Sequence, residues 1–497
     1  MLIKKDPDVI SAYLKDYSNL KGGSCVSVFF PENEKEVSEL LSSASRQGMP
    51  ITVSGAGTGV TGARVPFNGS VLSTEKMNRI LDIKVTPNGG EVRVEPGVLL
   101  NDLLDAVSSN GLFYPPDPTE KSSFIGGNIA TSASGARSFK HGSTRDYVLG
   151  LKVVLSSGET VRLERGDLFS DEDRAMELKL VSGETLKLDL PKYTVPRVKN
   201  AAGYYIKDNV DAIDLFIGQE GTLGIITEAR LRLLKKPDDV LECYCFFDKL
   251  KDALLFAYKA RDISRKNITQ AGSVNAASIE FFNGSALRFL REKHKKIPES
   301  AQGAIYFSQE VRKDTESKIL DAWAGLITEC GGSVDNTWFA QSRQEREELA
   351  GIRHDLPDMV NEFINRHNMT KIGTDIAVDA PYIDSMISYY NTVLTEAGFS
   401  YVMFGHIGDG HLHVNILPKD DKEYMAGHKI YEQFVKKAIS FNGTISAEHG
   451  IGKIKHEYLK MMYGEKAIRE MAALKKTLDP ACILGLDNIF PKELLEA

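Results

Sequence analysis

Histidines and carboxylates concentrate in two short segments of this 497-residue chain. The first is GHIGDGHLHVN, residues 405–415, and the second is AEHG, residues 447–450. Four of the ten histidines lie there, together with Asp409 and Glu448. Two imidazoles and a carboxylate with one position left open are the composition of a catalytic divalent-metal site, for which zinc, manganese and iron are candidates. The alternative interpretation is a pair of His-rich surface strands.

The first of these segments has the pattern of a hairpin. Apolar and polar residues alternate strictly from His411 to Ile416, which predicts a strand with His411, His413 and Asn415 on one face. The opposite face is apolar, and the polar face is not expected to lie in a core. His406 precedes a Gly-Asp-Gly turn, so the chain could fold back and bring His406 beside His413.

Length and composition place bounds on the rest of the molecule. With 42% hydrophobic residues, the chain can form about two or three soluble domains. A net charge of −7 argues against nucleic-acid binding. The N-terminus has neither an apolar signal region nor an Arg-rich transit pattern, which favours the cytoplasm, and membrane contact is expected only at the periphery of the inner membrane. The five scattered cysteines suit a reducing compartment.

The fold that must position these residues is predicted to begin with two strands, at residues 25–31 and 50–55. A helix around residues 37–44 separates them. The second strand leads into GAGTGVTGARVP, whose glycines match the spacing GxGxxG. A dinucleotide fold would need a helix to start at these glycines, but Pro66 and a further strand at residues 70–73 follow instead. We therefore predict a loop whose backbone N–H groups could bind a pyrophosphate.

Two further segments rich in glycine and serine suggest that the pyrophosphate is part of a larger ligand. They span residues 114–146 and 217–234, and each lies beside a β-rich run. Small residues there would let a bulky planar ligand lie against the backbone. Three such loops together favour one long cofactor.

These segments resemble the FAD-binding domain of the vanillyl-alcohol oxidase superfamily, the FAD-binding PCMH type, and the match covers almost the whole chain. GHIGDGHLHVN with AEHGIGKIK resembles more specifically the FAD-dependent D-2-hydroxyacid dehydrogenases, the group of D-lactate dehydrogenase, glycolate oxidase flavoprotein subunit and D-2-hydroxyglutarate dehydrogenase. The resemblance implies an α+β fold. Residues 1–235 would form the FAD-binding domain and residues 236–445 an antiparallel α+β cap, while residues 446–497 would complete the active site and return to the FAD domain.

The resemblance also assigns roles to individual residues. His406, His413 and Glu448 would bind the metal, and His449 would be the catalytic base. Arg353, Lys371 and Asn415 would bind the substrate. Thr58 stands where some superfamily members carry a flavin-linked histidine, so non-covalent FAD is expected. The residues expected to contact FAD are Ser54, Gly55, Gly57, Thr58, Gly59, Asp117, Gly126, Gly127, Asn128, Ser134 and Gly135.

The implied reaction is oxidation of a D-2-hydroxyacid to the 2-oxoacid, with electrons passed to a quinone, a cytochrome or an electron-transferring flavoprotein. The resemblance also allows a homodimer. Pro357 stands where the hydroxyglutarate enzymes carry a hydroxyl group, which weakens the assignment to a C5 dicarboxylate. Two alternatives stay open: an FAD oxidase of an alcohol or sugar acid that uses oxygen, and a non-catalytic flavin subunit of an electron-transfer complex.

Overall fold

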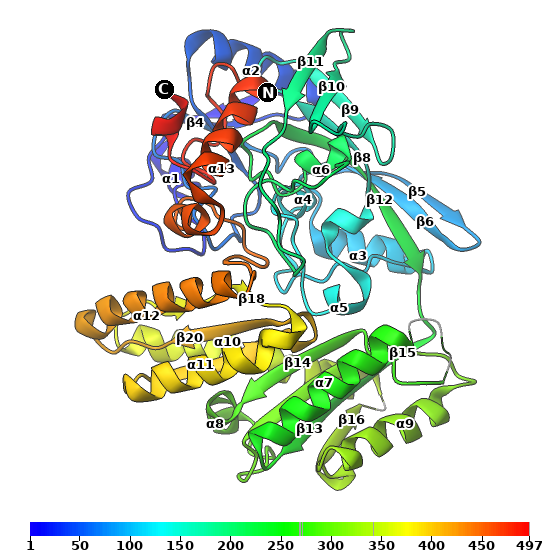
Figure 1. Ribbon diagram of the computed structural model, residues 1–497. Coiled ribbons are helices and arrows are strands. Elements are labelled where there is room, and N and C mark those ends of the chain that lie inside the picture. Colours follow the sequence, from blue (N-terminus) through cyan, green and yellow to red (C-terminus); the bar gives the residue numbers. More distant parts are fainter. Residues whose placement is uncertain (268–269, 271, 341, 497) are drawn as a thin grey trace.

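The N-terminal and central parts of the chain build separate sheets, and the two parts lie against each other (Figure 1). The computed structural model describes residues 1–267, 270, 272–340 and 342–496. The elements of the N-terminal part are β1 (Leu2–Lys4), α1 (Pro7–Ser11), β2 (Ser27–Phe30), α2 (Glu34–Gln47), β3 (Ile51–Ser54), β4 (Ser70–Ser73), β5 (Ile80–Thr86), β6 (Gly89–Val94), α3 (Leu100–Ser109), β7 (Leu112–Phe113), α4 (Ile125–Ala130), α5 (Ser138–His141), β8 (Val148–Val154), β9 (Thr160–Glu164), β10 (Ala175–Lys179), β11 (Thr185–Asp189), α6 (Ala212–Leu215) and β12 (Ile225–Lys235).

The predicted start of this part is confirmed. Strands β2, β4 and β3 pair in parallel, and β1 adds an antiparallel edge. Helix α2 buries Val37, Leu40 and Leu41, and it ends at Gly48, whose φ of 61° suits a left-handed cap. Residues 55–69 between β3 and β4 contain no helix, so the glycine loop is not a dinucleotide-binding turn. A second sheet follows, with the order β5-β6-β12-β8-β9.

The central part is one antiparallel sheet covered by helices on both faces, as the resemblance implies for a cap. Its strand order is β16-β13-β15-β14-β19-β20-β17, and β18 also pairs with β20. The elements here are β13 (Asp239–Phe247), α7 (Leu250–Lys266), β14 (Ser278–Asn283), α8 (Gly284–Lys293), β15 (Gly303–Val311), α9 (Glu316–Glu329), β16 (Thr337–Ala340), α10 (Arg343–Arg366), β17 (Ile372–Gly373), β18 (Ile376–Ala377), α11 (Ile383–Glu396), β19 (Tyr401–Gly405), β20 (His411–Ile416) and α12 (Asp421–Ser440).

The two faces of the cap sheet differ in what covers them. Leu412, Val414 and Ile416 of β20 pack in the same core as buried residues of α11 and α12, as their alternation predicts. On the other face, α8 and α10 pack over a separate core of aromatic and aliphatic residues. The histidines of β20 therefore point away from α11 and α12.

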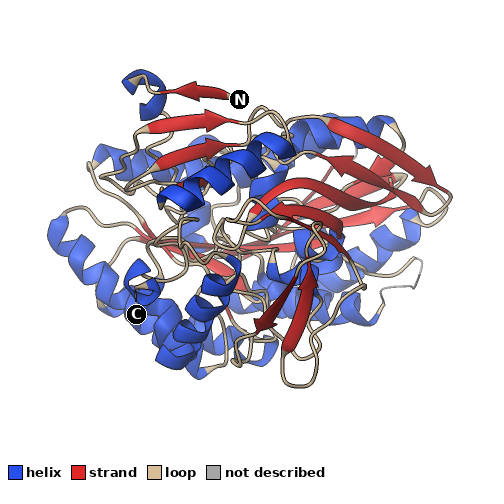
Figure 2. Ribbon diagram, turned by 90° about the horizontal axis from the view of Figure 1, so that it is seen from above, coloured by secondary structure: helices blue, strands red, loops and turns tan. Residues whose placement is uncertain are grey.

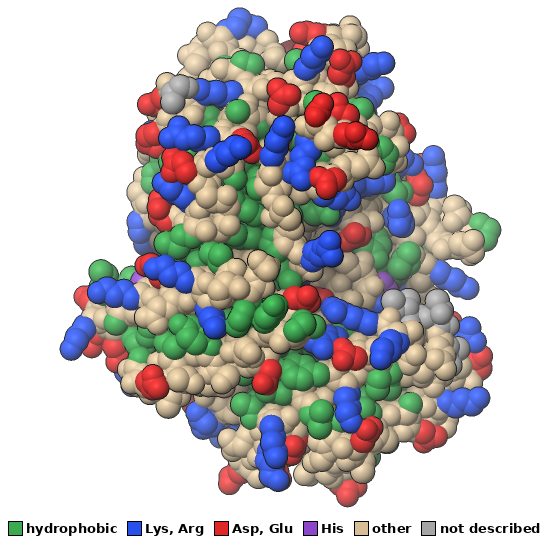
Figure 3. Space-filling model, viewed as in Figure 1, with side chains coloured by type: hydrophobic (Ala, Val, Ile, Leu, Met, Phe, Trp, Pro, Cys, Tyr) green, Lys and Arg blue, Asp and Glu red, His purple; other side chains and the backbone are tan. Residues whose placement is uncertain are grey.

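The last segment returns to the N-terminal part, where α13 (red) lies near α2 and β4 (blue) in Figure 1; Figure 2 shows the helices and strands of the same molecule from above. After residues 446–455, helix α13 (His456–Leu478) bends at Gly464, and the backbone N–H of Ile51 donates to Ile483 O at 2.7 Å. Acidic and basic side chains are interspersed over the face of the described chain shown in Figure 3, rather than sorted into a basic surface. Within the described residues, no helix combines the length and apolarity needed to cross a bilayer.

Candidate active site

The predicted hairpin forms and brings His406 beside His413. The chain leaves β19 at Gly405, makes one short helical turn over Ile407–Asp409, and enters β20. Gly410 has a φ of 67°, and a Cβ there would collide with the carbonyl oxygen of Val378. The rings of His406 and His413 are 5.6 Å apart between centroids.

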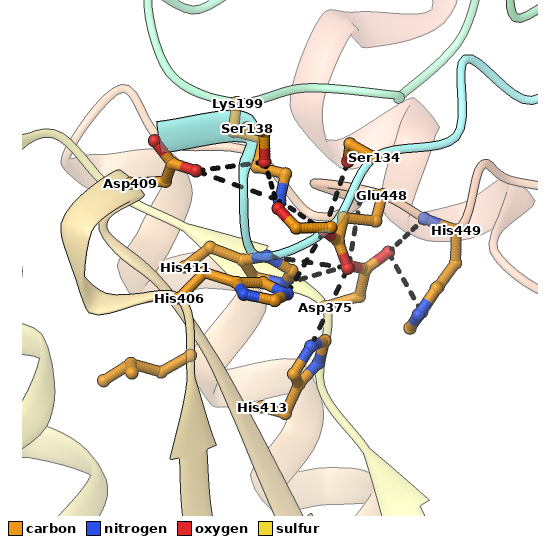
Figure 4. Close-up of polar contacts among 12 residues, drawn as sticks. Ser134, Ser138, Lys199, Asp375, His406, Asp409, His411, His413, Glu448 and His449 are labelled. Atoms are coloured by element: carbon orange, nitrogen blue, oxygen red, sulfur yellow. Dashed lines mark hydrogen bonds and ion pairs between the residues drawn. The ribbon is translucent and has the colours of Figure 1, made fainter. Parts of the chain in front are cut away.

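Glu448 completes a cluster with the histidines of the hairpin (Figure 4). Its Oε1 lies 3.3 Å from His406 Nε2, and its Oε2 lies 3.8 Å from His413 Nε2. His411 belongs to the same cluster, because one ligand atom from each of the four residues lies within 4.8 Å of the others. His411 is not among the metal ligands predicted from the sequence.

The tautomers of the two predicted histidine ligands suit metal binding. His406 Nδ1 donates to Glu280 Oε1 at 2.5 Å, and His413 Nδ1 donates to the carbonyl of Thr374 at 3.3 Å. Both rings therefore direct Nε2 toward Glu448, an arrangement common among metal-binding histidines. Against burial, Glu280 and Glu448 raise the pKa of His406 to about 9, so a metal would displace a proton from its Nε2. The completely buried His411 places Nε2 3.1 Å from Asp375 Oδ1 and Nδ1 4.0 Å from Glu448 Oε2, without hydrogen-bond geometry to any described residue. This donor set fits a divalent cation.

Glu448 is also the point where the cap meets the glycine-rich segment of the N-terminal part. Ser134 Oγ donates to its Oε1 at 3.2 Å, and Lys199 Nζ forms an ion pair with the same oxygen. Against the effect of burial, Lys199 and His406 hold the pKa of Glu448 well below its usual range. The carboxylate is therefore charged and available as a ligand.

His449 stands next to the cluster without being one of its ligands. Its ring stacks on His413 with centroids 5.7 Å apart and planes inclined by 17°. The side chain is 35% exposed, and burial lowers its pKa while Asp375 opposes the shift. A neutral imidazole with an accessible edge can accept a proton.

The predicted substrate residues are connected to the cluster to different degrees. Arg353 of α10 places Nε 3.2 Å from Glu280 Oε2, so Glu280 joins Arg353 to His406. Asn415 is buried two residues beyond His413 on β20, with β17 as its neighbour. Lys371 is half-buried just before β17, and burial lowers its pKa.

The predicted FAD segments lie side by side. A Cβ on Gly55 would come within 3.9 Å of Gly127 Cα, and one on Gly126 would lie 2.5 Å from Pro96 Cβ. No backbone N–H of residues 56–59 donates to another described residue. Bare N–H groups beside a glycine-lined wall are suited to a pyrophosphate and a planar ring.

The other predicted FAD contacts are in the same region. Asp117 forms ion pairs with Lys121 and Arg137, the latter at 2.8 Å, and a Cβ on Gly135 would collide with the Asp117 carbonyl. Asn128 is buried, and its Nδ2 has no hydrogen-bond partner among the described residues. An unpaired buried donor of this kind is available to a ligand.

Models of two protein families match this chain: the FAD binding domain over residues 26–164 and the C-terminal domain of FAD linked oxidases over residues 248–486. The glycolate oxidase subunit GlcD of Bacillus subtilis is 32% identical over 94% of this chain and 89% of its own length. The chain belongs to this family of FAD-linked oxidoreductases.

Further members of the family differ in the substrate that their names state. A D-lactate dehydrogenase of Anaerostipes hadrus is 30% identical over 92% of this chain and 87% of its own. A D-2-hydroxyglutarate dehydrogenase of Stutzerimonas stutzeri is 28% identical over 98% and 95%. The family resemblance drawn from the sequence motifs is thus confirmed.

Solved structures agree on the fold. The 4-ethylphenol oxidase of Gulosibacter chungangensis superimposes with a TM-score of 0.71 over 99% of this chain and 95% of its own, at 16% identity. An alkyldihydroxyacetonephosphate synthase gives 0.67 over 97% and 81%, at 17% identity. The expected α+β fold, an FAD-binding domain with a cap, is confirmed.

Two features of this family member were not expected from its sequence. His411 and Asn415 are buried, although the polar face of β20 was not expected to lie in a core. Their burial is tolerated because a network of charged side chains covers this face. Three residues of that network were missed: Glu280, Lys199 and Asp375.

Proposed function

We propose that this protein oxidises a D-2-hydroxyacid of the D-lactate, glycolate or D-2-hydroxyglutarate class to the 2-oxoacid, with FAD and a divalent metal. One observation supports this proposal most strongly. The cluster of His406, His413 and Glu448 lies beside His449 and next to Ser134 of the glycine-rich segment. The names of the relatives support this class of substrate.

In this proposal His406 and His413 hold the metal through Nε2, and Glu448 holds it through its carboxylate. Zinc, manganese and iron all suit such ligands. A divalent cation supplies Lewis-acid polarisation of the substrate hydroxyl. Glu280 fixes the His406 ring by accepting from its Nδ1, which keeps Nε2 directed at the site.

The protein's own side chains bind the substrate and move its proton. His449 accepts the hydroxyl proton, a step for which a histidine typically contributes about 10²–10⁴-fold. Arg353 binds the substrate carboxylate, since its guanidinium lies beside the cluster, with Nε 3.2 Å from Glu280 Oε2, and a guanidinium suits a bidentate pair with a carboxylate. Lys371 and Asn415 add a second cation and a carboxamide.

FAD supplies the acceptor for the hydride of the substrate. We propose that it binds without a covalent link, because Thr58 occupies the position of the histidine linkage and no cysteine lies in the three glycine-rich segments. Its partners are those predicted above from Ser54 to Gly135. The unpaired N–H groups of residues 56–59 support a pyrophosphate there.

The domain boundaries and the setting of the reaction are part of the same proposal. The boundary at residue 235 is supported by the end of β12 at Lys235 and the start of β13 at Asp239 on another sheet. We infer a non-oxygen electron acceptor, either a quinone, a cytochrome or an electron-transferring flavoprotein. A cytoplasmic location and a homodimer stay predictions.

The test is anaerobic mixing of the purified flavoprotein with a panel of D- and L-2-hydroxyacids while flavin absorbance is followed. We expect fast bleaching by one D-hydroxyacid, with dye reduced in the absence of oxygen. Bleaching by alcohols or sugar acids with stoichiometric peroxide would favour the oxidase alternative. If none of the 2-hydroxyacids, alcohols or sugar acids bleaches the flavin, the result would indicate a non-catalytic subunit.

A further inference from the structure

Asp375 is the acidic residue buried most deeply beneath the candidate site. Its side chain is 1% exposed, and it stands between β17 and β18, two short strands that both pair with β20. An isolated carboxylate at such a depth would be strongly unfavourable. Neighbouring groups must therefore stabilise the negative charge of Asp375. These partners indicate the role of Asp375.

Each carboxylate oxygen of Asp375 has its own set of partners. Oδ2 accepts from Lys455 Nζ at 2.9 Å, from Ser446 Oγ at 2.7 Å and from the backbone N–H of His449 at 3.0 Å. Oδ1 accepts from the backbone N–H of Glu448 at 3.2 Å and lies 3.1 Å from His411 Nε2. One carboxylate therefore holds Ser446, Glu448 and His449, and the backbone carbonyl of Asp375 accepts from the N–H of Ala447 at 2.8 Å.

The same carboxylate also faces the imidazole of His449. Asp375 Oδ2 lies 3.4 Å from His449 Nδ1, close enough to favour the tautomer with the proton on Nδ1. Nε2 is then the basic nitrogen. A carboxylate holds the histidine of a catalytic triad in one tautomer and one orientation in the same way.

We propose that Asp375 is a positioning residue that acts through His449, fixing its tautomer and its orientation. The inference rests on the proposed function, in which His449 accepts the substrate proton. Lys455 and Ser446 support this role of Asp375, because they keep the buried carboxylate charged and directed at residues 446–449.

The test compares Asp375→Asn, His449→Asn and the double variant as FAD-loaded proteins by rapid mixing with the hydroxyacid that bleaches the parent. We expect Asp375→Asn to slow flavin reduction by about 10²–10⁴-fold, with substrate affinity within a few-fold of the parent. The double variant should be no slower than His449→Asn, because residues that act as a unit are not additive. Asp379→Asn, an exposed residue four positions later that caps Ala380, is the matched control.

Three results would overturn the inference. One is flavin reduction by Asp375→Asn within a few-fold of the parent while His449→Asn is slow. Another is a double variant whose loss is the product of the two single losses. The third is loss of FAD or of bound metal from Asp375→Asn, which would mean that the carboxylate maintains the fold or the metal cluster instead.

Should Asp375→Asn not fold, Ser446→Ala decides the question, since it removes one hydrogen bond to Oδ2 and leaves the carboxylate in place. Flavin reduction should slow by about 5-fold, and not at all in a His449→Asn background. If Ser446→Ala slowed flavin reduction equally in the parent and in the His449→Asn variant, the result would contradict a role of Asp375 through His449. A parent protein that no hydroxyacid bleaches would instead reject the proposed function.

Discussion

The glycine-rich segments and the histidine cluster meet at Ser134 and Glu448, but they present different parts of the chain to their ligands. Residues 56–59 offer backbone N–H groups, and Gly55 and Gly127 lie together without side chains. The cluster offers imidazoles and a carboxylate from two separate segments, and buried acidic side chains of other strands hold them. A backbone site depends on the absence of a Cβ, whereas a side-chain site depends on its supporting partners.

The largest expected effect comes from removing one ligand of the cluster. His406→Ala should lose bound metal and lower turnover by at least about 10²-fold, because supporting residues alone are worth about 10–100-fold. FAD should stay bound, since the glycine-rich segments are untouched. Metal analysis, turnover and flavin absorbance of the same sample measure all three quantities.

His428→Ala is the matched control for that variant, because His428 lies on α12 and its ring packs on Tyr424. Chelation of the parent should reproduce the loss of turnover with FAD retained. Full activity of a protein shown to be free of metal would contradict the proposed role of the cluster.

The difference between the two regions also explains what could be read from the sequence. The hairpin was predictable because its alternation and its Gly-Asp-Gly turn are local, and the glycine loop because its spacing is local too. Glu280 and Asp375 lie 126 and 36 residues before His406 and His411, respectively, and no motif surrounds them.

A weaker signal was nevertheless present for Glu280. It is the single charged residue of SIEFFN, a strand that is buried at every position. A lone charge in such a strand has to be paired, so a partner could have been expected although not identified. For Lys199, which follows an exposed Arg197, the sequence offers no comparable signal.

A smaller effect is expected from filling the space of a glycine in the cofactor region. Gly126→Ala places a Cβ 2.5 Å from Pro96 Cβ, so α4 must shift, at a cost of about 1–3 kcal/mol. We expect weaker FAD binding and an unchanged metal content per folded molecule. FAD released into the supernatant by mild acid measures the binding and checks that the link is non-covalent.

Gly325→Ala on α9 is the control for that substitution, because a Cβ there meets nothing within 4 Å. Flavin that stays with the acid-precipitated chain would reject non-covalent binding. Equal loss of metal and FAD in Gly126→Ala would show that the two regions are not separable.

The smallest effect concerns a contact between the glycine-rich segment 114–146 and the cap sheet. Glu310 of β15 accepts from Lys140 Nζ at 2.8 Å and from His141 Nε2 at 2.5 Å, both on α5. Burial alone would raise the pKa of Glu310. The hydrogen bonds and charges of His141 and Lys140 outweigh this effect and lower the pKa from 4.5 to about 2. Above pH 4.5 the carboxylate is charged in the folded and the unfolded chain, and the stabilisation is complete.

As the pH falls from 4.5 toward 2, the unfolded chain takes up the proton first, so this stabilisation is progressively lost. Glu310→Gln should lower the free energy of unfolding at pH 7 by roughly 1–3 kcal/mol, a range reduced from the full shift because the side chain is 24% exposed. Denaturant unfolding of parent and variant at pH 7, 4 and 3 measures the difference, which should shrink steadily. A difference that is constant from pH 7 to 3 would mean that Glu310 stabilises the interface by packing, not by its charge.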